Sequence, residues 1–243
     1  MISKNKLKEL AAYRLQKRLD EDDLFIVEGP RLAAEAQQWG IDVVCTCATE
    51  AWQGAADGNV GECFTVSQAE LERLSLMRTP NQVWMLARRP HIFPYDAIPH
   101  SPWVLALDRL QDPGNMGTIL RTADWYGVRR VVCSSDTVSC WGAKVVQASM
   151  GAVFRTRVEY VDLPQWLATC GMPVYGATLN GMPLSRTETY TPGVLLIGNE
   201  GRGISPEALA AVTHPVTIPN KGQTAESLNA AVAAAILIDK LIG

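Results

Sequence analysis

The chain has 243 residues, enough for one large domain or two modest ones at the usual size of about 100–200 residues per domain. Apolar side chains make up 47% of the chain and charged side chains 19%, which excludes a disordered protein and provides material for a core. The formal net charge of −3 argues against a protein that binds polyanions with its whole surface.

Hydropathy and cysteine spacing exclude further classes. The longest unbroken apolar run, Ala230 to Ile238, has nine residues, whereas a membrane span needs about 20. The first twenty residues are basic and polar and lack the apolar stretch of a secretory signal. The six cysteines form no Cys-x-x-Cys pair and the three histidines are scattered, so we expect reduced cysteines, no metal site and a cytoplasmic protein.

The first 89 residues are predicted to form a small mixed α/β domain. Pro30 at the start and Gly40 after the end delimit one helix, and Ser67 with Glu70 forms a capping box at the start of another. Apolar periodicity adds the other elements. We predict helices over residues 4–19, 30–38 and 67–74, and strands over residues 24–27 and 82–88.

Residues 90–102 are predicted to be a linker. Four of these thirteen residues are prolines, which remove backbone donors and restrict the residues before them. Neither a helix nor an inner strand is compatible with this composition. A second domain is therefore expected over residues 103–243.

The second domain alternates apolar strands with helices. We predict strands over residues 103–107, 131–133, 174–178, 194–197 and 216–218, and helices over residues 118–126, 143–149 and 225–241. Strands that are apolar throughout and joined by helices are typical of a parallel sheet covered by helices on both faces.

Two loops of this domain carry polar residues directly after strands. Residues 112–117 (Asp-Pro-Gly-Asn-Met-Gly) predict a tight turn that presents Asn115, with Arg121 six residues further on; the alternative is a plain turn and a surface Arg121–Asp124 pair. Residues 198–203 (Gly-Asn-Glu-Gly-Arg-Gly) let backbone amides approach a ligand, and Glu200 needs a partner there.

A third loop leads into the last helix. Residues 218–222 are followed by Ser227 and Asn229, which we expect inside the first turns of an alanine-rich helix; the alternative is ordinary helix capping. The alanines imply that another segment packs very close to this helix.

The three loops are expected to meet. Ligands of parallel sheets bind at the carboxyl ends of the strands, so one pocket can hold Asn115, Arg121, Glu200, Ser227 and Asn229. This set contains no cysteine or histidine, which argues against thiol chemistry and against acid–base catalysis by histidine.

The N-terminus carries a local basic patch. Residues 1–18 hold six basic side chains and one acidic side chain, whereas the chain as a whole is mildly acidic. The alternative to a binding role is a solvated helix face.

Taken in order, these segments resemble the three motifs of the SpoU/TrmH-type ribose 2′-O-methyltransferases of the SPOUT superfamily. The residues that carry the resemblance are Asn115, Gly117, Arg121 and Ala123, then 198–203, then Ser227-Leu228-Asn229, together with Phe25-Ile26-Val27-Glu28-Gly29 near the start. Residues 220–225 depart from the pattern, because relatives often carry Met and a glycine-richer turn there.

The resemblance implies a deep trefoil knot in the parallel sheet domain, S-adenosylmethionine as cofactor, and a homodimer whose site is completed across the interface. It implies a ribosomal-protein-like RNA-binding domain at the N-terminus, in which Lys4, Arg14, Lys17 and Arg18 contact phosphates of rRNA or tRNA. The reaction would be methyl transfer from the cofactor to a ribose 2′-hydroxyl.

The resemblance also implies roles for single residues. In the family that the chain resembles, the residue corresponding to Arg121 is given the role of general base. An arginine stays protonated in proteins, so we expect Arg121 to bind the nucleotide's phosphate and to stabilise the developing alkoxide. Asn115 would orient Arg121 or the ribose, and Glu200 would pair with Arg121 or Asn229. The expected cofactor-binding residues are Thr178, Leu179, Asn180, Gly198, Ile218 and Leu228.

Two alternatives stay open at this point. The chain could be a non-catalytic RNA-binding relative, or an α/β enzyme that uses the glycine loop for a small nucleotide. The intact polar set argues against the first, and the absence of a phosphate-loop lysine and of a Gly-x-Gly-x-x-Gly motif argues against the second.

Overall fold

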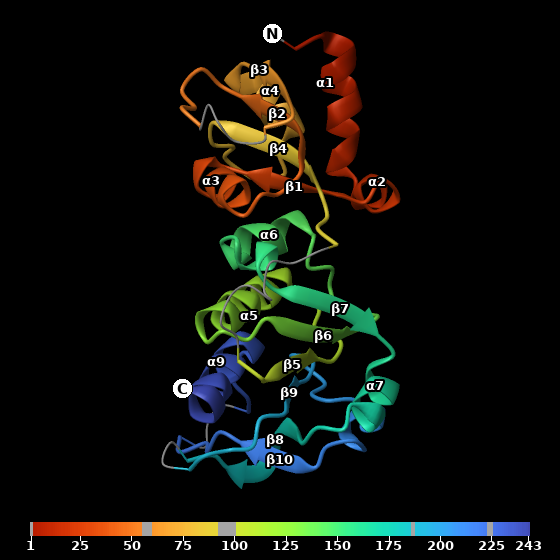
Figure 1. Ribbon diagram of the computed structural model, residues 1–243, viewed down its shortest axis with the longest axis vertical. Helices are drawn as coiled ribbons and strands as arrows, with labels where there is room; N and C mark the ends of the chain where they lie inside the picture. The colour runs from red at the N-terminus through yellow and green to blue at the C-terminus, as the bar shows by residue number, and fades with distance from the viewer. Residues whose placement is uncertain (1, 55–59, 92–100, 186–187, 223–225) are drawn as a thin grey trace. The chain divides into compact units, whose positions relative to one another are not determined.

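The computed structural model describes residues 2–54, 60–91, 101–185, 188–222 and 226–243, which form two units (Figure 1). Unit 1 comprises Met1–Phe93 with Trp141–Phe154, and unit 2 comprises Pro94–Cys140 with Arg155–Gly243. Most of the predicted proline-rich linker, residues 92–100, lies outside the described residues.

Unit 1 is a four-stranded sheet with helices. Its strand order is β1-β4-β2-β3, with β4 antiparallel to β1 and β2, and β3 parallel to β2. Its elements are α1 (Lys4–Ala11), α2 (Gln16–Glu21), β1 (Leu24–Glu28), α3 (Pro30–Gln38), β2 (Val43–Ala48), β3 (Glu62–Thr65), α4 (Gln68–Leu74), β4 (Val83–Arg88) and α6 (Ala143–Ser149).

Local sequence signals account for the ends of two of these helices. Pro30 occupies the first turn of α3, where a missing N–H costs no hydrogen bond. At α4 the predicted capping box is present, because the Ser67 side chain accepts from the Glu70 N–H and the Glu70 carboxylate accepts from the Ser67 N–H.

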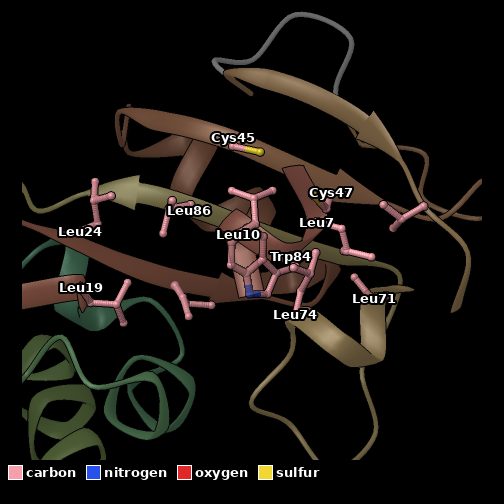
Figure 2. Close-up of a cluster of buried hydrophobic side chains, with 12 residues drawn as sticks. Leu7, Leu10, Leu19, Leu24, Cys45, Cys47, Leu71, Leu74, Trp84 and Leu86 are labelled. Atoms are coloured by element: carbon pink, nitrogen blue, oxygen red, sulfur yellow. The ribbon is translucent and has the colours of Figure 1, made fainter. Parts of the chain in front are cut away.

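The core of unit 1 lies between helices α1, α2 and α4 and the sheet. Figure 2 shows the cluster, in which leucines from the helices surround Trp84 of β4. Its buried members are Leu7, Leu10, Leu19, Leu24, Ile26, Cys45, Cys47, Val66, Leu71, Leu74, Trp84 and Leu86. Each fully buried leucine contributes about 1.5–3 kcal/mol relative to an exposed one, so this cluster stabilises unit 1.

The segment that carries α6 packs with unit 1 through aromatic rings. The ring centroid of Phe25 in β1 lies 4.7 Å from that of Trp141 and 5.9 Å from that of Phe154, which are the first and last residues of the segment. These distances lie within the range of favourable aromatic pairs.

Unit 2 is a six-stranded sheet in which every pairing is parallel. The strand order is β10-β8-β9-β5-β6-β7. Its elements are β5 (Val104–Leu107), α5 (Pro113–Trp125), β6 (Arg130–Ser134), β7 (Arg157–Val161), α7 (Leu163–Thr169), β8 (Val174–Pro183), β9 (Val194–Ile197), α8 (Pro206–Leu209), β10 (His214–Thr217) and α9 (Ala230–Ile242).

Helices cover both faces of this sheet, as the apolar strands predict. Val104 and Ala106 of β5 pack in one cluster with Leu163 and Leu167 of α7 and Ala208 of α8. Side chains alternate along a strand, so the neighbouring residues of β5 face the opposite side, where α5 and α9 contact each other (Figure 1). The predicted α/β class with a helix-flanked parallel sheet is confirmed.

Three predicted boundaries were wrong. The helix predicted over residues 4–19 is interrupted at Leu15, whose backbone is extended. The predicted tight turn at residues 112–117 belongs largely to α5, which begins at Pro113 because Asp112 caps it. The last helix begins at Ala230, so Ser227 precedes the helix and Asn229 caps it.

Strands β2, β3 and β7 and helix α7 were among the elements that were not predicted. Within the part of the chain that the structure describes, no helix combines the length and the apolar character needed to cross a membrane.

Candidate active site

The loops after β5 and β9 are joined at the carboxyl ends of these adjacent parallel strands. Asn199 donates its Nδ2 to the carbonyl of Arg109 at 2.7 Å, and the N–H of Ser205 donates to Oδ2 of Asp108 at 2.6 Å. Asp108 is buried, so its carboxylate requires such partners. These two hydrogen bonds therefore join the two predicted loops into one platform.

A chain of side-chain hydrogen bonds connects all three loops. Nδ2 of Asn115 in α5 donates to Oε1 of Glu200 at 2.9 Å, and Nδ2 of Asn229 donates to Oδ1 of Asn115 at 2.9 Å. Oδ1 of Asn229 in turn accepts from the N–H groups of Ala231 and Val232 at the start of α9. The expected convergence of the loops is present for these three residues.

The direction of this chain follows from chemistry. The N–H groups at the start of α9 require an acceptor, so Oδ1 of Asn229 faces them and its Nδ2 faces Asn115. A carboxylate only accepts, so Nδ2 of Asn115 faces Glu200. Each amide thus has one orientation that satisfies both neighbours.

Glu200 is held in its ionised form. Burial alone would raise the pKa of its carboxyl, but the hydrogen bonds from Asn115 and from backbone N–H groups, including those of Asp112 and Gln111, lower the pKa below its usual value. These two backbone bonds measure 3.2 Å and 3.4 Å. A carboxylate that is ionised and saturated with donors positions other groups and is a poor proton acceptor.

Arg121 lies apart from this chain. It is exposed on α5, and the structure gives it no hydrogen bond or ion pair with a described residue. The alternative Arg121–Asp124 pair is wrong, because Asp124 binds Arg129 and Arg155 instead. The expected pairing of Glu200 with Arg121 or Asn229 is replaced by the bond to Asn115.

Ser227 is also exposed and has no hydrogen bond to another residue within the described part of the chain. Of the five residues expected in one pocket, the structure links Asn115, Glu200 and Asn229 directly and leaves Arg121 and Ser227 free for other partners.

The expected cofactor-binding residues lie on β8 and in the loops after β9 and β10. Gly198 is buried, and a Cβ there would lie 2.2 Å from the carbonyl carbon of Gly203, so only glycine fits. Leu179 and Leu228 expose 75% and 47% of their surface, unusual for leucines in a folded unit. The carbonyl of Leu179 accepts from the hydroxyl of Thr217 at 3.1 Å, which ties β8 to β10.

The other three residues of this set differ in exposure. Thr178 and Ile218 are half-buried, and Asn180 is exposed on β8. All three border the same end of the sheet as the loops described above.

Sequence reasoning missed two residues that build the platform, Asp108 and Asn199. Oδ1 of Asn199 accepts from the N–H groups of Gly201 and Arg202 at 3.0 Å and 3.1 Å, which shapes the glycine loop. An asparagine before Glu-Gly is a typical turn signal of this kind. For Asp108, an acidic residue directly after a buried strand was the available signal.

The basic residues at the N-terminus lie on α1, α2 and the turn between them. The Lys17 side chain is 86% exposed, and Lys4 is exposed as well. Arg18 pairs with Asp22 at 3.1 Å, and Arg14 donates to the carbonyl of Arg73 at 3.3 Å. In the described ranges, no group of three or more His, Cys, Asp or Glu side chains could hold a metal ion.

Comparison with known families assigns most of the chain. The SpoU rRNA Methylase family matches residues 102–239, and the MRM3-like substrate binding domain matches residues 4–85. A 23S rRNA (guanosine(2553)-2′-O)-methyltransferase, RlmP of Bacillus subtilis (strain 168), is 31% identical over 98% of this chain and 96% of its own length. The human mitochondrial rRNA methyltransferase 3 is 37% identical over 37% of this chain and 23% of its own length.

Solved structures resemble the whole chain. A protein from Porphyromonas gingivalis assigned to the TrmH family of RNA methyltransferases has a TM-score of 0.85 and 36% identity, covering 99% of this chain and 98% of its own. An AdoMet-bound rRNA methyltransferase from Sinorhizobium meliloti has a TM-score of 0.81 and 27% identity, covering 99% and 95%. The SpoU rRNA Methylase family model matches more than half of the chain, and the three motif loops occur in the expected order. The chain therefore belongs to the SpoU rRNA Methylase family.

Proposed function

We propose that the chain transfers a methyl group from S-adenosylmethionine to a ribose 2′-hydroxyl of rRNA or tRNA. The observation that carries the proposal is the hydrogen-bond chain from Glu200 through Asn115 to Asn229, which gathers the three family motifs at one end of the parallel sheet. Membership of the SpoU family gives this arrangement its reaction class.

The residues of the site fit the cofactor. Gly198 packs directly against the backbone of Gly203, so the loop after β9 is tightly folded, and its backbone groups would contact the cofactor. Leu179 and Leu228 are exposed and can cover the adenine ring of the cofactor. Ile218, which directly follows β10, would contribute a further apolar contact. Thr178 and Asn180 would supply polar contacts. Bound S-adenosylmethionine supplies an activated methyl group on a sulfonium.

The chain's own side chains divide the remaining work. Arg121 is exposed and free of ion pairs with described residues, so its guanidinium can bind the phosphate of the reacting nucleotide. The same cation stabilises charge that develops on the ribose oxygen. Asn115 and Glu200 hold the loops in place, and Ser227 is available as a hydroxyl partner for the substrate.

The proposal includes a homodimer with a site completed across the interface. Trp125 is 85% exposed at the end of α5, and Val232 of α9, the helix that contacts α5, is 47% exposed. Arg121 lies four residues before Trp125 and thus on the same face of α5. A partner subunit on this face would cover the tryptophan and receive the arginine.

The proposal further includes a trefoil knot in unit 2. The family match over residues 102–239 supports this topology, because the resemblance to the SpoU-type enzymes implies it.

Unit 1 would deliver the RNA. Lys4, Arg14, Lys17 and Arg18 lie on α1, α2 and the turn between them, and their cations would contact phosphates, with the charges of Lys17 and Arg18 partly offset by Glu21 and Asp22. The matched substrate binding domain over residues 4–85 supports this role. The six cysteines form no disulfide in the structure, and we propose a reducing, cytoplasmic location.

Methyl transfer from labelled S-adenosylmethionine to total rRNA and tRNA tests the function. We expect label in RNA as alkali-resistant linkages, the signature of a 2′-O-methyl group. Binding of the cofactor without any transfer to either RNA would instead indicate a non-catalytic relative.

Reversing Lys17 to glutamate should weaken RNA binding and leave cofactor binding unchanged.

A further inference from the structure

Unit 1 contains a cavity of about 240 Å³ that the proposed reaction does not use. It is lined by Ile26, Glu28, Leu76, Met77, Ala143, Lys144, Gln147 and Ala148, which come from β1, from the segment after α4 and from α6. Well-packed interiors contain few voids larger than a water molecule, and a cavity of about 150 Å³ already accommodates benzene. This space is therefore large enough for a planar base.

The wall of the cavity combines apolar surface with one buried carboxylate. Glu28 is only 5% exposed. It accepts from the hydroxyl of Ser75 and, at 2.9 Å, from the N–H of Leu76. Burial raises the pKa of its carboxyl despite these hydrogen bonds. Each carboxylate oxygen can accept a second hydrogen bond, so Glu28 keeps capacity for a ligand with two donors.

The polar residues of the cavity differ in depth. Gln147 of α6 is half-buried and offers an amide, whereas Lys144 of the same helix is exposed and carries a cation. Leu76 is 42% exposed, so the cavity reaches the surface beside it. A ligand in this space meets apolar walls, an acceptor pair, an amide and a positive charge near solvent.

We propose that this cavity binds an unstacked guanine nucleotide of the RNA substrate, with the Glu28 carboxylate accepting from the base and Lys144 contacting its phosphate. Guanine presents two adjacent donors, N1–H and the 2-amino group, which match a carboxylate better than the donors of other bases. Proteins that read RNA bind splayed bases in this way, on their edges and between apolar side chains. The inference rests on the proposed RNA substrate and adds a base-specific contact to it.

Binding assays without S-adenosylmethionine test the inference separately from methyl transfer. The probes are the labelled pentanucleotide UUGUU, its inosine counterpart UUIUU, which lacks the 2-amino group, and free GMP. We expect the full-length protein to bind UUGUU at least tenfold more tightly than UUIUU, because a hydrogen bond to a charged group is lost. Equal binding of both pentanucleotides overturns the assignment, as does binding of GMP without binding of UUGUU, which indicates a free-nucleotide site.

Two variants locate the contact. Ala148→Leu fills the cavity while keeping Glu28, and should abolish the preference for UUGUU. Glu28→Gln replaces one acceptor with a donor and should reduce the preference to near unity, whereas Glu72→Gln, an exposed change on α4, should leave it intact. Thermal melting identifies any variant that fails to fold. A folded Ala148→Leu protein with wild-type preference places guanine elsewhere and refutes the inference.

Discussion

The replacement Glu200→Gln tests the hydrogen-bond chain directly. Oε1 of Glu200 accepts from Asn115 at 2.9 Å and from the N–H of Asp112 at 3.2 Å, and Oε2 accepts from the N–H of Gln111 at 3.4 Å. Glutamine keeps one acceptor oxygen, which can serve the two shorter bonds. Its amide nitrogen then faces the N–H of Gln111, where the longest and weakest bond is lost.

The magnitude follows from the change in charge. Hydrogen bonds to charged groups contribute about 1.5–3 kcal/mol and neutral ones about 0.5–1.5 kcal/mol, so each of the two short bonds loses about 1 kcal/mol. Glu200 is half-buried, and solvent screening reduces this sum. We expect the free energy of unfolding to fall by about 1–2 kcal/mol at pH 7 and methyl transfer to fall about tenfold.

The pH dependence provides the sharper measurement. The pKa of Glu200 is lowered in the folded state, so its contribution is fully present above the pKa of the unfolded chain and is lost as the pH falls through the folded pKa. The stability difference between wild type and Glu200→Gln, measured by urea denaturation, should therefore shrink below about pH 4.

Glu207→Gln is the matched control for this experiment, because Glu207 is exposed in the first turn of α8. Its effect should stay within about 0.5 kcal/mol, as expected for a charge near a helix start. A Glu200→Gln protein that matches this control in stability at pH 7 would show that the carboxylate does not hold the loops.

Three further changes test the remaining parts of the site. Arg121→Ala should lower turnover about 10²–10³-fold, while stability and cofactor affinity, measured by denaturation and calorimetry, stay unchanged because the side chain is exposed. Gly198→Ala should abolish cofactor binding, since its Cβ would lie 2.2 Å from backbone; Gly201→Ala, with its nearest atom at 3.9 Å, should bind normally, and equal affinities would contradict the close approach. Trp125→Glu should shift sedimentation to a monomer, and an unchanged dimer would place the interface elsewhere.

Strong local signals explain where the sequence predicted the fold well. The bounds of α3 are those predicted, because proline fixes the start of the helix and its amphipathic pattern ends before Gly40. The capping box at Ser67 fixed α4 in the same way. Buried strands such as β9 are apolar throughout and only four residues long, which is too short for a typical helix.

Weak or ambiguous signals explain the errors. Gly114 and Gly117 lie inside α5 and predicted a turn, but tertiary packing overrides their low helix propensity. The edge strand β3 is largely exposed, so it has no apolar pattern to detect. β7 likewise has no fully buried residue.

The residues of the candidate site could be predicted from the sequence, but their hydrogen-bond partners could be predicted only in part. Motif order identified Asn115, Glu200 and Asn229, because each follows a strand of the parallel sheet. Which amide faces which carboxylate depends on distances that a sequence does not contain. For the same reason the local signals at Asp108 and Asn199 did not reveal that these two side chains tie the loops together.

The hydrogen-bond chain has a consequence for biosynthesis. Asn115 is separated from Glu200 by 85 positions and from Asn229 by 114, so its partners emerge from the ribosome long after it does. A nascent polypeptide that still lacks α9 cannot form the hydrogen bond between Asn229 and Asn115, even when its earlier strands have formed. We therefore expect the three loops to be joined only after α9 has been synthesised.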